Sequence, residues 1–207
     1  MGYSKFKKMS KVLNMFGLKS ETANLFENIH IDNIQPSLWL SESLDIAYLT
    51  PPTNEKSKSE RLVSPILLEV YKKYMQSISF FSGEVINIDA QKNLAGECDF
   101  VFALHRPTMV LESPIISIAE AKDEDMEWGL AQCAAQLYGA HLFNLQNKKE
   151  LPILYGCATT GVDWHFLKFE DNTFFIDRKP MTHLPQILGT WHWILQWYVG
   201  NPQLKTN

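Results

Sequence analysis

Three ionisable residues, Asp99, Glu120 and Lys122, stand where two neighbouring strands would bring them together. Glu120-Ala121-Lys122 ends a largely apolar run, and strand residues i and i+2 point to the same face. Asp99 lies in the strand-like stretch 98–102, so an acid and a base would meet beside a second acid. Two carboxylates are hard oxygen ligands of the kind Mg²⁺ accepts, and a nearby lysine can orient or help deprotonate a metal-bound water. These residue types predict the chemistry of a phosphodiester hydrolase.

The strand pattern around Asp99 sets the alternatives for this acid. Asp99 alternates with Val101 on one face, while Phe100 and Phe102 take the other. A single acid in such a strand is costly to bury unless it is paired or metal-bound. The competing interpretation is an ordinary acid at a solvated edge, with Glu120 and Lys122 as an exposed ion pair.

The order of these features resembles the PD-(D/E)XK nuclease superfamily. In that order a strand with an acid, a turn, a strand ending in Glu-x-Lys and a glutamine-bearing helix follow one another. More locally, residues 55–177 resemble a family of nuclease-fold proteins that is common in cyanobacteria and has no established function. The segments that carry this likeness are Ser59-Glu60, 64–69, 96–100, 129–133 and 158–161.

This resemblance implies an α/β fold with a restriction-endonuclease-like core, a mixed central sheet flanked by helices. It also implies metal-dependent hydrolysis of DNA, with Mg²⁺ or Mn²⁺ as cofactor. Asp99 and Glu120 would hold the metal together with the carbonyl of Ala121, and Lys122 would position the attacking water. The family's usual Pro-Asp pair is Cys98-Asp99 here, a departure that leaves the acid in place.

A further acid is expected on the helical segment that starts near residue 55. Glu60 shares its apolar stripe, which suits either a helix-start charge or an inward functional acid. Glu69 is the rival, but its spacing to Lys73 fits an ordinary i,i+4 pair. The resemblance favours Glu60, which would hold a second metal ion or a water. If Ser64 is an N-cap with Pro65 at the first helical position, Glu60 lies on a separate turn.

Two glutamines, Gln132 and Gln136, stand four residues apart on the helix predicted after Glu120. Both lie on a flank away from the apolar stripe of that helix, where glutamine is a good solvent-facing helix former; the stripe consists of Leu130, Cys133, Ala134, Leu137, His141 and Leu145. Small residues are expected to let the helix pack close to the sheet, namely Gly129, Ala131, Ala134, Ala135, Gly139 and Ala140. In related nucleases a glutamine on this helix lies beside the active site, and Gln132 fits that position best.

At 207 residues the chain fits one domain of ordinary size. Pro51-Pro52 is a strong breaker, so residues 51–207 are predicted to form the nuclease-like core domain and residues 1–50 an N-terminal appendage. Within the appendage, residues 1–19 have the apolar spacing of a short amphipathic helix that docks on the body.

The formal net charge of −4 gives no global attraction to DNA, the expected partner, because nucleic acids usually bind a basic face. A local basic patch would have to supply the attraction, although charge runs are more often solvated faces. The candidate residues are Lys5, Lys7, Lys8 and Lys11 near the N-terminus, and Lys56, Lys58 and Arg61 further on.

The three cysteines lie in apolar segments without CxxC or histidine spacing, which favours a reducing compartment over zinc or disulfides. No apolar run reaches the roughly 18 residues of a membrane span, and no secretion signal is present, so a cytoplasmic protein without a membrane partner is expected. The tryptophans can stack bases, but at helical spacing they more often form a core or the seam of a homodimer.

Hydrophobic periodicity predicts the elements that position these residues. The stretch 26–49 holds two alternating pairs, Ile29 with Ile31 and Leu38 with Leu40, which fit a short strand. Hairpin turns are expected at 91–93 and 170–172. Helices are predicted over 55–76, 126–147 and 184–199, and strands over 80–89, 94–104, 115–122, 153–160, 164–169 and 173–176.

A second hypothesis is a catalytically silent nuclease-fold module that binds protein or nucleic acid. The acidic balance and the lack of a DNA-reading element support it. Other enzyme classes lack their signatures, since the chain has no GxSxG elbow, no dinucleotide or Walker glycine pattern and no metal-ligand spacing among its six histidines.

Overall fold

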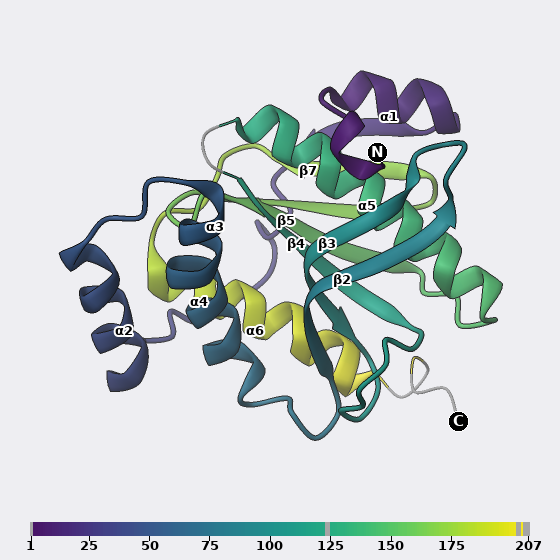
Figure 1. Ribbon diagram of the computed structural model, residues 1–207. Coiled ribbons are helices and arrows are strands. Elements are labelled where there is room, and N and C mark those ends of the chain that lie inside the picture. The colour runs from purple at the N-terminus through teal and green to yellow at the C-terminus, as the bar shows by residue number, and fades with distance from the viewer. Residues whose placement is uncertain (1, 123–124, 202–203, 205–207) are drawn as a thin grey trace.

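The computed structural model describes residues 2–122, 125–201 and 204, and its centre is a seven-stranded mixed sheet (Figure 1). The strands are β1 (Lys19–Ala23), β2 (Ser79–Asp89), β3 (Leu94–Ala103), β4 (Ile115–Ala121), β5 (Ile153–Thr159), β6 (Trp164–Glu170) and β7 (Thr173–Asp177). They lie in the order β1-β7-β6-β5-β4-β3-β2. The pairs β4–β5 and β1–β7 are parallel, and the others are antiparallel. The predicted mixed sheet flanked by helices is confirmed at this level.

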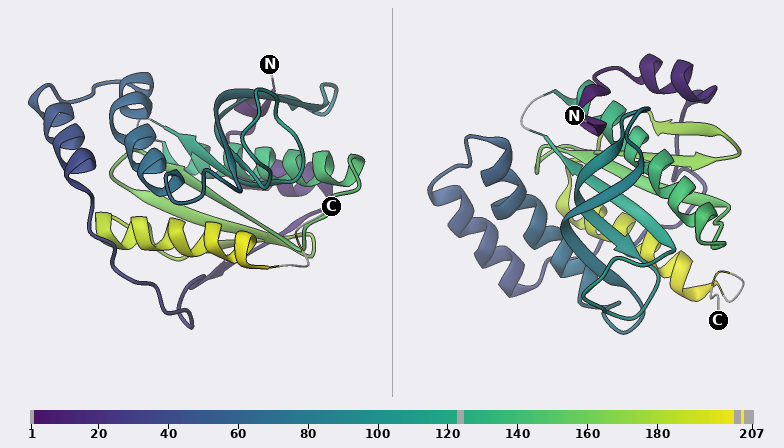
Figure 2. Two further views of the ribbon diagram at one scale, coloured as in Figure 1. Left: turned by 90° about the horizontal axis from the view of Figure 1, so that it is seen from below. Right: turned by 45° about the vertical axis from the view of Figure 1, so that its right-hand side comes forward.

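Helices cover both faces of the sheet (Figure 2). The helix α5 (Met126–Gln146) packs on one face, and α4 (Ser64–Tyr71) and α6 (Leu184–Gly200) cover the other. The ring of Phe102 on β3 lies 5.5 Å from that of Trp191 on α6, so the Phe100–Phe102 face is the α6 side. The face that carries Asp99 is therefore the α5 side, because neighbouring strand residues alternate. Outside these layers, α1 (Met9–Phe16) packs on α5 and α2 (Leu38–Leu49) on α4.

The close fit of α5 on the sheet follows from small residues. All seven residues of β4 are buried, as expected for a central strand with helices on both faces. A Cβ atom added to Gly156 on β5 would collide with Leu137 of α5. The glycine therefore allows the helix to lie low over the strands, which brings the side chains of α5 to the level of the strand ends.

The helical stretch after Asn54 is continuous but irregular. It comprises α3 (Glu55–Lys58), the π-helical turn η2 (Ser59–Val63) and α4, and it ends at Tyr71, before the predicted Gln76. In the wider π turn the amide of Ser64 donates to the carbonyl of Ser59, directly before Pro65, which has no amide hydrogen to donate. Ser64 therefore lies inside the helical stretch and is not its N-cap.

Arg61 stabilises α2 and is not available as a phosphate contact in this conformation. Its guanidinium donates to the carbonyls of Ala47 at 2.8 Å and Thr50 at 2.7 Å, which belong to the last turn and C-cap of α2. A cation at a helix C-terminus satisfies carbonyls that have no partner within the helix.

The strand expected within 26–49 is wrong. Leu38 and Leu40 lie in α2, which begins after Ser37, whose hydroxyl accepts from the amide of Leu40. The alternating pair was misleading because the apolar residues of α2 are spread around the helix and many are exposed, so a helical period is not visible in the sequence.

Residues 1–50 contribute to the sheet and to the core. The strand β1 pairs with β7, and Tyr3, Phe6 and Val12 are buried in the main hydrophobic cluster. The hydroxyl of Tyr3 in the short 3-10 helix η1 (Tyr3–Lys5) donates to the carbonyl of Ile86 at 3.2 Å. The division into appendage and core domain remains a prediction. The docking predicted for residues 1–19 is confirmed by the buried side chains of Tyr3, Phe6 and Val12.

In the part of the chain that the structure describes, no helix is both long and apolar enough to span a membrane. The three cysteines are free and buried.

Candidate active site

Asp99 and Glu120 face each other across two antiparallel strands. The β3–β4 register pairs Phe100 with Ala119, so its continuation by one residue sets Asp99 opposite Glu120. Residues directly opposite in such a ladder project from the same face and lie close together. The site lies where β4 ends, on the face covered by α5.

Asp99 is held by the backbone of β4. Its Oδ2 accepts a hydrogen bond from the amide of Ala121 at 2.7 Å. Burial raises the pKa of the Asp99 carboxyl to about 6, although the Ala121 amide and the Lys122 ammonium act in the opposite direction. Among the described residues, Oδ1 of Asp99 has no hydrogen-bond partner.

Glu120 is almost completely withdrawn from solvent, with 1% of its surface exposed. Its Oε1 lies 2.9 Å from Nζ of Lys122, and its Oε2 accepts from Nε2 of Gln136 at 2.7 Å. Burial and the charge of Asp99 raise the pKa of Glu120, and Lys122 and Gln136 oppose that rise. The two carboxylates therefore disfavour each other's ionisation, which is the usual behaviour of acids that share a site.

Lys122 connects the end of β4 with α3 and α5. Its Nζ lies 3.3 Å from Oε1 of Glu55 and 5.4 Å from the centroid of the Trp128 ring. Burial lowers the pKa of Lys122, but the charge and hydrogen bond of Glu120, with Glu55, overcome this and raise it. A Cβ on Gly129 would stand 2.9 Å from Cγ of Lys122, so glycine at this position allows α5 to approach the lysine.

The helix acid that contacts Lys122 is Glu55, which the sequence analysis did not single out. Glu60, the residue expected there, lies in the wall of the same pocket as Asp99 and pairs with Lys56 at 3.9 Å. Glu69 is remote from the site, since its carboxylate accepts from the amide of Ser37 and pairs with Lys72 and not with the predicted Lys73.

Both glutamines of α5 are buried, so the alternative in which they face solvent is wrong, as is their predicted place outside the buried stripe of the helix. Gln136 is fully buried and donates to Glu120, whereas Gln132 is 6% exposed and borders the pocket beside Glu120 and Lys122. The sheet side of α5 consists largely of alanine and glycine, so the large apolar residues do not mark it. The Oε1 of Gln132 has no hydrogen-bond partner among the described residues.

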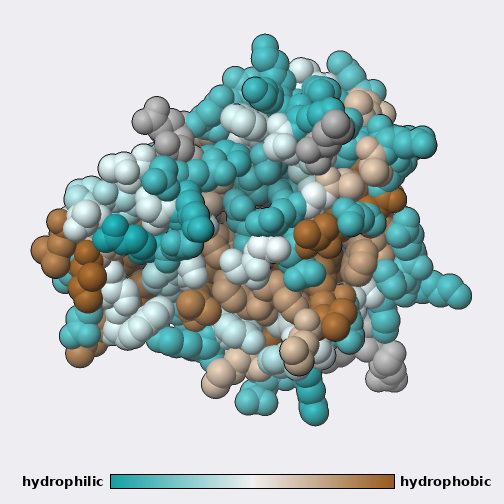
Figure 3. All heavy atoms as spheres, viewed as in Figure 1, coloured by the Kyte–Doolittle hydropathy of each residue, from teal (hydrophilic) through white to brown (hydrophobic). Residues whose placement is uncertain are grey.

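Two pockets open onto these side chains. The first, of about 370 Å³, lies between α3–η2 and the β2–β3 hairpin, and the second, of about 240 Å³, is bordered by Tyr3 and Ser4. The pockets share Glu55, Glu97 and Asp99, so they adjoin. Figure 3 shows a mostly hydrophilic surface between α3 and the β2–β3 hairpin.

Within the described residues, no three His, Cys, Asp or Glu side chains form a metal-binding group. The site offers two carboxylates, Asp99 and Glu120, and the backbone of Ala121. Mg²⁺ is commonly bound through one or two carboxylates and keeps several waters, so a donor set of this size suits it.

The residues missed by sequence reasoning had weak signals. Asn54 and Ser57 form a capping box, which would have fixed the start of α3 and the position of Glu55 in its first turn. The spacing of Ala131, Ala135 and Gly139 would have shown that Gln136 lies on the sheet side of α5. No sequence signal predicts that Tyr3 and Ser4 lie at the site, because nearly a hundred residues separate them from Asp99.

No family model and no curated protein sequence matches this chain. The roles of its residues are therefore inferred from their geometry and chemistry.

Proposed function

We propose that this protein is a metal-dependent nuclease that hydrolyses phosphodiester bonds of DNA, with Asp99 and Glu120 holding Mg²⁺ or Mn²⁺. The observation that carries the proposal is the pair of carboxylates set opposite each other on a buried sheet face, each with a raised pKa. Burial is the main cause of these raised pKa values and repulsion between acids adds to it, so a divalent cation at the site would favour the ionised form of both carboxylates.

The donor atoms fit such a cation. Each Glu120 oxygen has one partner, and a carboxylate oxygen can accept from more than one direction. The N–H and C=O of one strand residue point to the same side, so the Ala121 carbonyl faces β3 and Asp99 as its amide does. A bound metal would supply an activated water and a counter-charge for the phosphate.

The surrounding residues have distinct roles in this proposal. Lys122 stays an ammonium at neutral pH because its pKa is raised, so it donates hydrogen bonds to the attacking water or a phosphate oxygen and is not the base. Glu55 orients Lys122, and Gln136 fixes the rotamer of Glu120. Glu60, in the wall of the first pocket, is placed to hold a water or a second metal ion.

The order of elements supports a restriction-endonuclease-like core. The acid on β3, the Glu-x-Lys at the end of β4 and the glutamine-bearing α5 follow one another as in the superfamily that the sequence resembles.

A cleavage assay tests the proposal. Supercoiled plasmid and single-stranded DNA are incubated with Mg²⁺, Mn²⁺ or EDTA, and products are resolved on gels. We expect cleavage with either metal, none with EDTA and none for Asp99→Asn. Glu112→Gln, a matched acid outside the site, should cleave like the wild type. Metal-dependent cleavage that survives Asp99→Asn would place the activity elsewhere.

One observation favours a second candidate, the catalytically silent module. Lys122 is paired with both Glu120 and Glu55, so the charges at the site are partly neutralised without a metal. If this protein shows neither cleavage nor a metal-dependent rise in melting temperature, it is a catalytically silent module.

A further inference from the structure

The surroundings of the proposed metal site include two adjoining pockets. They also include a lysine beside a tryptophan ring and the side-chain amide of a buried glutamine. The two pockets that share Glu55, Glu97 and Asp99 form one continuous hollow, the site groove. It runs from Lys56 and Ser82 at one end, past Asp99, to Ser4 and Gln132 at the other. Asp99 lies at the middle of its length, so a chain laid in the groove would pass over the carboxylates and extend to both sides.

The floor of the groove is deep and its walls stand close. Glu120 and Lys122 expose 1% and 6% of their surface, and Glu55 of α3 contacts Lys122 from above. The opposite wall is the N-terminal segment, fixed by the hydrogen bond from Tyr3 to Ile86. A phosphate group reaches the floor only between these walls. Pockets of about 370 and 240 Å³ have room for part of one polynucleotide strand and are too small to take both strands of a duplex.

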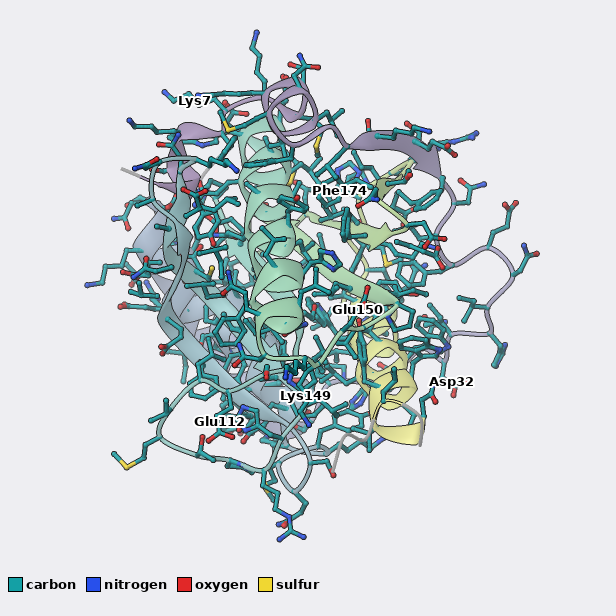
Figure 4. The ribbon with its side chains drawn as sticks, turned by 90° about the vertical axis from the view of Figure 1, so that its right-hand side faces the viewer. Lys7, Asp32, Glu112, Lys149, Glu150 and Phe174 are labelled. Carbon is teal, nitrogen blue, oxygen red and sulfur yellow. The ribbon has the colours of Figure 1, made fainter. Side chains whose placement is uncertain are left out.

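A basic and aromatic edge continues the groove beyond Ser4. Nζ of Lys7 lies 4.7 Å from the centroid of the Trp128 ring, and Nζ of Lys122 lies 5.4 Å from the same centroid. Figure 4 shows Lys7 at the opposite end of α5 from Lys149, so it lies beside the first turn of the helix. Proteins that bind single strands combine a basic groove for the backbone with aromatic rings on which bases stack.

Two buried polar atoms at this end have no partner among the described residues. They are Oε1 of Gln132, which borders the groove, and Nε1 of Trp128. Gln132 is more than nine-tenths buried. Among the described residues, Oε1 of Gln136 and the indole nitrogens of Trp164 and Trp191 in the core are also unpaired, so the lack of a partner does not by itself mark a ligand site. Oε1 of Gln132 is informative because it borders the groove, where a ligand could supply its donor and a second group of that ligand an acceptor for Trp128. The amino and carbonyl groups of a nucleobase supply both.

We propose that the substrate is a single polynucleotide strand that lies along the site groove, with its backbone on Lys7 and Lys56 and a base against Trp128 and Gln132. This inference rests on the proposed nuclease function, to which it adds the substrate class. The lining of the groove is itself acidic, with Glu55, Glu60, Glu97, Asp99 and Glu120 against Lys56 and Lys122, so a bound metal ion together with Lys7 would supply the attraction for the backbone.

Binding measured without cleavage tests the inference. Fluorescence anisotropy of the full chain in Ca²⁺ compares a labelled DNA strand, the duplex of the same length and sequence, and the matching RNA strand. We expect the DNA strand to bind at least about tenfold more tightly than the duplex. An RNA strand that binds like the DNA strand also supports the inference, because the claim concerns single-strandedness.

Variants at three positions test where the polynucleotide strand binds. Trp128→Ala should weaken strand binding by about 5- to 100-fold, and Trp128→Phe, which keeps a ring, by less. Lys7→Ala, an exposed change that should not disturb folding, should weaken it and reduce the slope of log Kd against log salt by about 0.7. Lys19→Ala, on β1 at the other edge of the sheet, is the matched control and should bind like the wild type.

Two results overturn the inference, and both differ from a failure of the nuclease function. Duplex binding as tight as strand binding contradicts the single-strand claim even if Mg²⁺-dependent cleavage occurs. Wild-type affinity in both Lys7→Ala and Trp128→Ala contradicts the proposed path. Preferential strand binding without any cleavage would remove the proposed function, and with it the claim that the strand is a substrate, while binding of a single strand along the site groove would stand.

Discussion

Nζ of Lys122 lies 2.9 Å from Oε1 of Glu120, and both side chains are withdrawn from solvent. Three of the neighbouring charges are acidic, Glu120, Asp99 and Glu55, and a single ammonium serves them. The acids therefore outnumber the ammonium at the end of a buried strand, and the raised pKa values of Asp99 and Glu120 reflect the cost of ionising them there. Such an arrangement lowers the stability of the fold, and the binding of a positively charged ligand would account for its presence.

Replacement of Lys122 separates catalysis from metal binding. Lys122→Met removes the ammonium but keeps most of the apolar stem, so turnover should fall by about 10²- to 10³-fold, the range for loss of a hydrogen-bond donor that stabilises the transition state. Mn²⁺ affinity should persist, because both carboxylates remain. Cleavage rates and Mn²⁺ titration check this, with Lys148→Met as the control. Unchanged cleavage together with a lowered melting temperature would assign Lys122 a structural role only.

Metal binding should stabilise the fold by mass action. Mg²⁺ or Mn²⁺ at about one hundred times its Kd should add about 2.7 kcal/mol to the free energy of unfolding, seen as a higher melting temperature. Asp99→Asn with Glu120→Gln should abolish this shift. The matched variant Glu112→Gln should retain it. A shift that persists in the double variant would mean that the metal binds at another place.

The raised pKa of Asp99 predicts a pH-dependent effect of Asp99→Asn. Between the ordinary pKa near 3.8 and the folded value of about 6, the folded state binds more protons than the unfolded state, so wild-type stability falls as pH rises. The asparagine variant lacks this loss. The stability of the variant relative to the wild type should therefore rise by about 1–2 kcal/mol between pH 4 and pH 7, less than the full value of the shift because Asp99 is partly exposed. Metal-free urea unfolding from pH 4 to pH 8 measures the difference, and a constant difference would contradict the assignment.

Gln136 should stabilise Glu120. Gln136→Leu leaves Oε2 of the buried Glu120 carboxylate without its donor, and the free energy of unfolding should fall by about 1–3 kcal/mol. Mn²⁺ affinity at neutral pH should also weaken, because the pKa of Glu120 rises further. Chemical denaturation and metal titration check both effects. Gln146→Leu, near the end of the same helix, is the control, and equal losses in the two variants would argue against a specific role.

The sequence predicted most strands and helices because their patterns are local. The apolar run of β4 and the acid–turn–Glu-x-Lys order located Asp99 and Glu120 before their register was known. The turn at Asp171 and Asn172, both in left-handed conformation, was also predictable from turn chemistry.

Contacts between distant segments could not be predicted in this way. Glu55 reaches Lys122 only because α3 packs across the end of β4, and Tyr3 borders the site because it fits against Gly96 and Gly139. Neither relationship leaves a periodic pattern in the sequence. The small residues of α5 predicted its close packing on the sheet, but the predicted buried stripe was too narrow, because the buried face also includes Gln132 and Gln136.

The central claim is that Asp99 and Glu120 hold a divalent cation, and an anomalous-scattering measurement on crystals soaked with Mn²⁺ tests it most directly. We predict a manganese peak between the two carboxylates, about 2.0–2.3 Å from one oxygen of each, with the Ala121 carbonyl as a further ligand. Crystals of the Asp99→Asn variant, soaked with Mn²⁺ in the same way, should lack the peak. A wild-type crystal with no peak there, or with manganese bound only at other acids, would contradict the claim.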